Sequence, residues 1–436
     1  MSLPKHTSFK SAVAPWIQEI PSHWVEKPFY ALARERKVKN KGMKEDNLLS
    51  LSYGEIVRKD INTPTGLLPE SFETYQIVEP DDVIFRLTDL QNDKRSLRSA
   101  ICSERGIITS AYLAVQFEDI LPAFMNYLMR AYDVQKVFYS MGGGLRQSLG
   151  FEDLRRMSIV APSLDEQISI VNFLDRETAR IDALIEKKGR FIALLKEKRA
   201  AVITHAVTKG IDVDVPMKDS GVAWIGEVPE AWTVTKLGYL GRSANGINIG
   251  GDAFGSGYPF VSYGDVYKHR QLPEEISGLV QSSKEDRRSY SVRSGDILFT
   301  RTSETVDEVA FPSVAMSTIE NAVFAGFLIR FRPHPNTLHP LFSKYAFQNS
   351  GLRDFFAREM KIVTRASLSQ GLLQSMPVTL PPLAEQERIG SHLETLNGRF
   401  ERLVAQTNRS IELLKEKRSA LITAAVTGKI DVRTAA

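Results

Sequence analysis

The sequence predicts an α+β fold in which one unit occurs twice and two long helices pair as an antiparallel coiled coil. The first observation behind this prediction is an internal repeat with pseudo-twofold character. Residues 195–208 (LKEKRAAVITHAVT) and 414–427 (LKEKRSALITAAVT) are identical at 11 of 14 positions, at an offset of 219 residues. The second is a long heptad-like pattern in each copy, and the third is a strand-rich block before each pattern.

Shorter blocks repeat in the same order along the chain. WIQEIPSHW (16–24) matches WIGEVPEAW (224–232), and LDEQ (164–167) matches LAEQ (383–386). The matching blocks keep the same order, while the offset between copies grows from 208 residues at the first block to 219 at the second. We infer that one ancestral unit was duplicated and that its loops later gained insertions. Between these blocks the two copies share only scattered anchors, so the two globular parts are expected to do different jobs.

The matched segments are predicted to be long helices. Each starts after a proline stop (Pro162; Pro381 and Pro382), lacks internal proline and ends near Gly210 or Gly428. Some forty residues at 1.5 Å per residue give a rod on the order of 60 Å long. A 3-4 spacing predicts a coiled-coil seam, formed by Leu174, Glu177, Ile181, Leu184, Lys188, Phe191, Leu195, Lys198, Val202 and His205, and by Leu393, Leu396, Phe400, Leu403, Thr407, Ser410, Leu414, Lys417, Leu421 and Ala424.

The blocks before the helices are predicted to be mixed α/β globules. Short apolar runs such as DDVIF (81–85) and DILFT (296–300) indicate strands, and one helix follows in each copy, FMNYLMRAY (124–132) and LFSKYAFQN (341–349). The predicted division is a globule in 1–160, a helix in 161–210, a globule in 211–379 and a helix in 380–436. Little chain follows Asp431, so we expect little tail to close the two ends together.

Composition excludes several classes of protein. With 43% hydrophobic and 25% charged residues, the 436-residue chain is typical of globular proteins, and it has no apolar run long enough for a membrane span. No secretory signal is visible, and the single cysteine, Cys102, cannot form an intramolecular disulfide, so we expect a cytoplasmic protein. The net charge of +4 permits a nucleic-acid partner without requiring one.

Basic side chains cluster in the loops that leave the predicted strands, interleaved with residues that can read base edges. Arg and Lys hold phosphates, while Arg, Asn, Gln and Thr discriminate bases in the major groove. A third element, x-Arg-x-Ser-Leu, recurs at offset 219 and suits phosphate contact. The candidate DNA-binding residues are Arg86, Thr88, Gln91, Asn92, Lys94, Arg95, Arg98, Arg146 and Ser148 in the first copy, and Arg287, Arg288, Arg301, Thr302, Ser303, Arg365 and Ser367 in the second. The alternative for the basic loops is a solvated surface, and the alternative for Arg146 and Arg365 is that each arginine pins its globule to its helix.

The chain shows no chemistry of its own. It has no nucleotide-binding P-loop and no methyltransferase motif, and its seven histidines are scattered. We therefore predict no catalytic residue, no cofactor and no metal site.

The motif order resembles that of the specificity subunit of type I restriction-modification enzymes. The resemblance rests on SGVAWIGEVPEAW (220–232), a divergent block, LAEQ (383–386) and the LKEKR-containing helix, all present twice. The blocks 82–96 and 295–308 resemble target recognition domains of that family.

The resemblance implies two target recognition domains, each reading one half of a bipartite site in double-stranded DNA. It implies that the helices set the spacing of the halves and seat two methyltransferase subunits, which bind S-adenosylmethionine and methylate adenine, and that restriction or motor subunits join through the methyltransferase complex. The competing hypothesis is a coiled-coil interaction or scaffold protein without DNA specificity.

Overall fold

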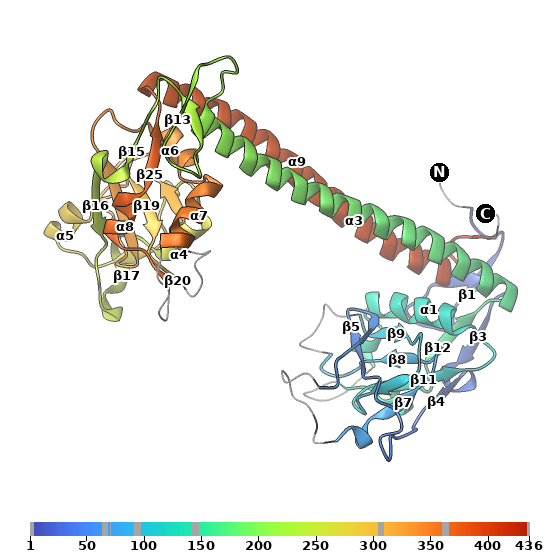
Figure 1. Ribbon diagram of the computed structural model, residues 1–436. Coiled ribbons are helices and arrows are strands. Elements are labelled where there is room, and N and C mark those ends of the chain that lie inside the picture. Colours follow the sequence, from blue (N-terminus) through green and yellow to red (C-terminus); the bar gives the residue numbers. More distant parts are fainter. Residues whose placement is uncertain are drawn as a thin grey trace. The chain divides into compact units, whose positions relative to one another are not determined.

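The computed structural model describes residues 4–62, 69, 71–90, 97–141, 148–303, 309–359 and 366–433 (Figure 1). The chain divides into two compact units. Unit 1 comprises residues 1–188 with 409–436, and unit 2 comprises residues 189–408. Each long helix contributes to both units, so each unit holds one globule and a segment of both helices.

Unit 1 is built on a four-stranded antiparallel sheet in the order β4-β11-β8-β9. Side chains alternate across its strand β8 (Val83–Phe85): Val83 and Phe85 join the main core with helix α1 (Pro122–Val134), while Ile84 joins a smaller cluster on the other face. The remaining elements are β1 (Phe9–Ser11), β2 (Glu19–Pro21), β3 (Val25–Pro28), β4 (Ala33–Glu35), β5 (Leu49–Ser52), β6 (Glu55–Arg58), β7 (Gln76–Val78), β9 (Ser99–Ile101), β10 (Gly106–Ile108), β11 (Leu113–Phe117), α2 (Phe151–Leu154) and β12 (Ser158–Ala161).

Unit 2 repeats this plan with a sheet in the order β16-β23-β19-β21. In its strand β19 (Ile297–Thr300), Ile297 and Phe299 join one core and Leu298 another, as in the first sheet. The remaining elements are β13 (Met217–Asp219), β14 (Glu227–Pro229), β15 (Thr233–Lys236), β16 (Gly241–Asn245), β17 (Phe254–Val261), α4 (Tyr263–Lys268), β18 (Leu279–Val280), α5 (Lys284–Ser289), β20 (Thr302–Ser303), β21 (Pro312–Val314), β22 (Val323–Phe324), β23 (Leu328–Pro333), α6 (Pro340–Ala346), α7 (Ser350–Glu359), β24 (Ala366–Ser367), α8 (Gln370–Ser375) and β25 (Pro377–Leu380).

The long helices are α3 (Leu164–Lys209) and α9 (Leu383–Val426), and they pair antiparallel as predicted. In unit 1 the end of α9 lies against the start of α3, where Arg418 Nε is 3.0 Å from a carboxylate oxygen of Asp182. In unit 2 the end of α3 lies against the start of α9, where Arg199 Nε donates to Asn397 Oδ1 at 2.5 Å.

The predicted seam is wrong at six positions. Of the residues assigned to it, Leu184, Phe191, Lys198, His205, Leu403 and Lys417 are exposed. The continuous line of buried and half-buried residues is instead Leu174, Thr178, Ile181, Ile185, Lys188, Ile192, Leu195, Arg199, Val202 and Ala206 in α3, and Leu393, Asn397, Phe400, Val404, Thr407, Ile411, Leu414, Arg418, Leu421 and Ala425 in α9. Apolar residues lie on both sides of the true seam, so the 3-4 spacing alone also fits a stripe one residue away.

The last turns of each long helix enter the core of a globule. Ile422, Ala425 and Val426 of α9 belong to the main core of unit 1, and the equivalent residues of α3 belong to that of unit 2. Beyond α9, the backbone N–H of Asp431 donates to the carbonyl of Pro4 at 2.8 Å. The expectation of a tail too short to join the two ends is therefore wrong.

Within the part of the chain that the structure describes, no helix is both long and apolar enough to cross a membrane.

Candidate nucleic-acid interface

In unit 1, one backbone bond joins two of the predicted DNA-binding segments. The N–H of Leu149 donates to the carbonyl of Leu87 at 2.9 Å. Both leucine side chains are buried, which fixes the two segments to the core. The exposed Ser148 is thereby held beside the segment that carries Arg86 and Thr88, both half-buried, directly after strand β8.

Unit 2 contains the equivalent bond between equivalent segments. The N–H of Leu368 donates to the carbonyl of Arg301 at 2.7 Å. Beyond it, β20 pairs antiparallel with β24, with Thr302 opposite Ser367 and Ser303 opposite Ala366. The two predicted DNA-binding segments around Thr302 and Ser367 lie more than sixty residues apart in sequence, yet they form one pair of adjacent strands.

The side chain of Arg301 is partly engaged within unit 2. Its Nη1 donates to the carbonyl of Gly326 at 3.4 Å, and its backbone N–H donates to the carbonyl of Phe327. The guanidinium is half-buried. Its position directly before β20 places it beside the paired strands β20 and β24.

Arg98 has a structural position, which corrects its assignment as a DNA-binding residue. Its side chain is fully buried. Its Nη1 donates to the carbonyls of Arg86 and Thr88, and its backbone N–H donates to Asp133 Oδ2 at 2.9 Å. A buried guanidinium is tolerated only with hydrogen-bond partners, and here the partners are backbone carbonyls of the loop. Arg98 therefore stabilises the conformation of the loop that carries Arg86 and Thr88. The burial of Arg98 also contradicts the alternative of a solvated loop at this position.

Four basic residues of unit 2 surround one hollow of about 620 Å³. Lys284, Arg287 and Arg288 come from helix α5, and Arg293 follows it. Glu320 is the acidic residue on the lining. This excess of positive charge around a concave surface suits a phosphate group.

Local hydrogen bonds fix the start of α5 and so place its basic residues. Ser283 Oγ accepts the backbone N–H of Asp286 at 3.0 Å, and Asp286 accepts from the hydroxyl and backbone N–H of Ser283. This capping box lowers the pKa of Asp286, first through the Ser283 hydroxyl and then through its N–H. The Arg287 guanidinium lies 3.7 Å from the centre of the Tyr258 ring, which is a cation–π contact, while Arg288 is exposed.

The candidates Gln91, Asn92, Lys94, Arg95, Arg146 and Arg365 lie outside the described residues.

Sequence reasoning missed two features. The first is the stacking of Tyr258 on Arg287. It could not be predicted because the two residues are 29 positions apart and no local pattern connects them. The second is a cluster of His6, His23 and Glu166 in unit 1, in a chain for which no metal site was predicted. Widely spaced histidines carry no metal-site signature in sequence, so only the fold could bring these side chains together.

The chain is similar in sequence to known DNA specificity domains and subunits. A family model described as the type I restriction modification DNA specificity domain matches residues 229–413. A chain of Methanocaldococcus jannaschii, provisionally named the type I restriction enzyme MjaX specificity subunit, is 24% identical over 329 residues, which cover 72% of this chain and 69% of that one. The type I restriction enzyme StySPI specificity subunit of Salmonella potsdam is 24% identical over 277 residues, 63% of this chain and 58% of the relative.

A solved structure described by the words "complex assembly and conformational transition of the type I R-M system" matches with a TM-score of 0.70. The match covers 94% of this chain and 99% of that chain at 16% identity, which is a likeness of fold. It confirms the predicted α+β architecture with two long paired helices.

Proposed function

We propose that this chain, which belongs to the family of type I restriction-modification DNA specificity subunits, reads one half of a split DNA target with each of its two units. The chain would supply recognition alone, and its partners would supply the chemistry. This function implies a place in the cytoplasm, where such systems meet DNA.

One observation carries the proposal: the same loop-docking bond occurs in both units with different side chains around it. Leu149 to Leu87 and Leu368 to Arg301 are equivalent backbone bonds. A shared frame that presents different polar residues is what two readers of different half-sites require.

The proposed readers are the target recognition domains in 1–160 and 211–379, and the proposed spacers are the helices in 161–210 and 380–436. With Arg98 removed, the proposed DNA contacts are Arg86, Thr88, Ser148, Arg287, Arg288, Arg301, Thr302, Ser303 and Ser367, together with Gln91, Asn92, Lys94, Arg95, Arg146 and Arg365 from outside the described residues. The basic hollow of unit 2 adds Lys284 and Arg293 as phosphate contacts.

The long helices are proposed to seat two methyltransferase subunits in equivalent positions. Unit 1 exposes Leu184 of α3 and Leu413 of α9, and unit 2 exposes their counterparts Leu403 and Leu194. Leucines that a monomer leaves exposed in matching places favour two copies of one partner. The restriction or motor subunits would join through those methyltransferase subunits.

The direct test is a selection of bound sequences from random DNA duplexes, with the cognate methyltransferase subunit present. The proposal predicts enrichment of a motif in two defined halves separated by unspecified bases. A complex that forms but enriches no motif would favour the scaffold hypothesis instead.

The docking surface has its own test. Leu194→Glu and Leu413→Glu together should abolish co-purification with the methyltransferase subunit, and either change alone should reduce the complex from two methyltransferase subunits to one. Exposed Ala200→Glu is the matched control, because it adds one negative charge to α3 as Leu194→Glu does.

A further inference from the structure

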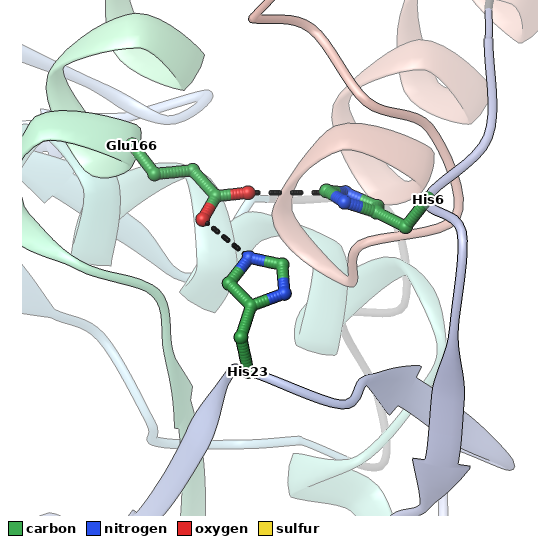
Figure 2. A group of neighbouring side chains, drawn as sticks. All are labelled: His6, His23 and Glu166. Carbon is green, nitrogen blue, oxygen red and sulfur yellow. Dashed lines mark hydrogen bonds and ion pairs between the residues drawn. The ribbon is translucent and has the colours of Figure 1, made fainter.

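Three side chains that can bind a metal meet in unit 1 (Figure 2). His6 comes from the segment before β1, His23 from the turn between β2 and β3, and Glu166 from the first turn of α3. One ligand atom from each lies within 4.8 Å of the other two. Figure 2 shows both imidazole rings turned toward the Glu166 carboxylate.

The distances fit one small cation among the three groups. His23 Nε2 lies 2.9 Å from Glu166 Oε2, and His6 Nε2 lies 3.8 Å from Glu166 Oε1. Ligand atoms each about 2.1 Å from a tetrahedral zinc ion are about 3.4 Å apart, a value between these two distances. Two imidazole nitrogens and a carboxylate oxygen form a ligand set that zinc ions accept.

The surroundings hold the ligands in place. His6 and Glu166 are 7% and 4% exposed, while the His23 side chain is 45% exposed and leaves the cluster open to solvent on one side. On the far side of the His6 ring, Nδ1 lies 3.7 Å from Asp431 Oδ2. This distance is longer than a hydrogen bond, and His6 Nδ1 has no hydrogen-bond partner among the described residues, so the Asp431 carboxylate acts on the imidazole through its charge.

The second copy of the repeat provides a comparison within the same chain. In unit 2 the equivalent carboxylate, Glu385, accepts a hydrogen bond from the buried indole Nε1 of Trp232 at 2.9 Å. In unit 1 the equivalent indole nitrogen, that of Trp24, has no hydrogen-bond partner among the described residues, and Glu166 faces the two histidines instead. The repeat positions of His6 and His23 carry Asp214 and Ala231, so this ligand set belongs to the first copy alone.

We propose that His6, His23 and Glu166 bind one divalent cation of the zinc class, with Asp431 as a positioning residue for His6. A water molecule or a second carboxylate oxygen completes the coordination. The bound ion would link the N-terminal segment, the turn before β3 and the start of α3. Since Asp431 also bonds to Pro4 through its backbone, the ion would stabilise the closure of the N- and C-terminal segments.

The experiment uses the full chain without a histidine tag, treated with a chelator and dialysed. Zinc titration by calorimetry and metal analysis should give one ion per chain, and cobalt(II) should give the visible absorption of a tetrahedral site. His23→Ala and Glu166→Gln should each weaken zinc binding by at least about tenfold, and Asp431→Asn by about tenfold. His23 is exposed, so its variant should fold normally, which circular dichroism checks.

Two changes serve as controls. Glu385→Gln alters the equivalent corner of unit 2, and His392→Ala removes an exposed histidine of α9. Both variants should bind zinc as the parent chain does. Zinc binding that is undiminished in His23→Ala and Glu166→Gln, or a parent chain that binds no zinc at micromolar concentration, would overturn the proposal.

Discussion

Gln386 accepts the backbone N–H of His339 at 2.8 Å through Oε1, while its Nε2 donates to the carbonyl of Pro381 at 3.0 Å. Gln167 makes the same two bonds in unit 1, to Leu121 and Pro162, at 2.8 and 3.0 Å. One buried glutamine thus joins the start of a long helix to the start of a globule's helix, α6 or α1. These bonds account for the recurrence of LDEQ and LAEQ in the sequence.

We expect Gln386→Ala to lower the free energy of unfolding of unit 2 by about 1–3 kcal/mol, because it takes a hydrogen-bond partner from the N–H of half-buried His339 and from the buried carbonyl of Pro381. Urea unfolding measures the change. Glu387→Ala, at the next and exposed position, is the control and should have little effect. Equal effects of the two substitutions would contradict this role for Gln386.

Tyr127 predicts a pH dependence of stability. Burial, and then the hydrogen bond that its hydroxyl donates to Asp175 at 2.6 Å, raise the pKa of Tyr127 to about 12. A tyrosine whose pKa is raised by folding contributes stability below its unfolded pKa of about 10 and loses that contribution as the pH rises toward 12. The stability difference between the parent chain and Tyr127→Phe should therefore be larger at pH 8 than at pH 11. Tyr239 is exposed, so the stability difference between the parent chain and Tyr239→Phe should be the same at pH 8 and pH 11. A stability difference for Tyr127→Phe that does not change between these pH values would refute the prediction.

The corrected seam predicts that Ile192→Ala destabilises the chain more than Phe191→Ala. Side-chain size alone would predict the opposite, because phenylalanine is the larger residue. Ile192 is half-buried in the seam, whereas its larger neighbour Phe191 is 45% exposed. We expect Ile192→Ala to lower the free energy of unfolding by about 1–2 kcal/mol and Phe191→Ala to cost less. Thermal and urea unfolding of the two variants compare them directly, and a greater loss in Phe191→Ala would restore the seam predicted from sequence.

Substitutions of Arg98 and Arg288 should have different effects: the first should lower stability, and the second should weaken DNA binding. Arg98→Ala removes a buried guanidinium that holds two loop carbonyls, so we expect the free energy of unfolding to fall by about 2 kcal/mol or more. Arg288→Ala changes an exposed side chain, and we expect unchanged stability with a slope of log affinity against log salt reduced by about one. Glu285→Ala, exposed on the same helix, controls for the loss of a charged side chain, and a slope unaffected by Arg288→Ala would remove that residue from the interface.

The repeat, the helices and the sheet strands could be predicted because each leaves a local signal. Proline stops before Leu164 and Leu383 mark where the helices begin. Short apolar runs such as Val83–Phe85, whose side chains alternate between two cores, indicate strands. The seam was displaced because Leu184 and Ile185 are equally apolar, and only packing decides which of them faces the partner helix.

The candidate sites depended more on the fold. Basic residues after a strand indicate an interface, but sequence cannot distinguish the buried Arg98 from the exposed Arg288, since burial depends on what packs above each side chain. His6, His23 and Glu166 lie on three separate segments, so their meeting follows from tertiary structure alone.

We propose that each unit reads its own half-site, and the test is an exchange of residues 233–364 for the corresponding block of a type I specificity subunit. The exchanged chain, assembled with methyltransferase subunits, is used to modify genomic DNA, and the methylated adenines are mapped by sequencing. The expected result is a change in one half of the target while the other half and the spacing remain. A change in both halves, or methylation with no two-part motif, would contradict it.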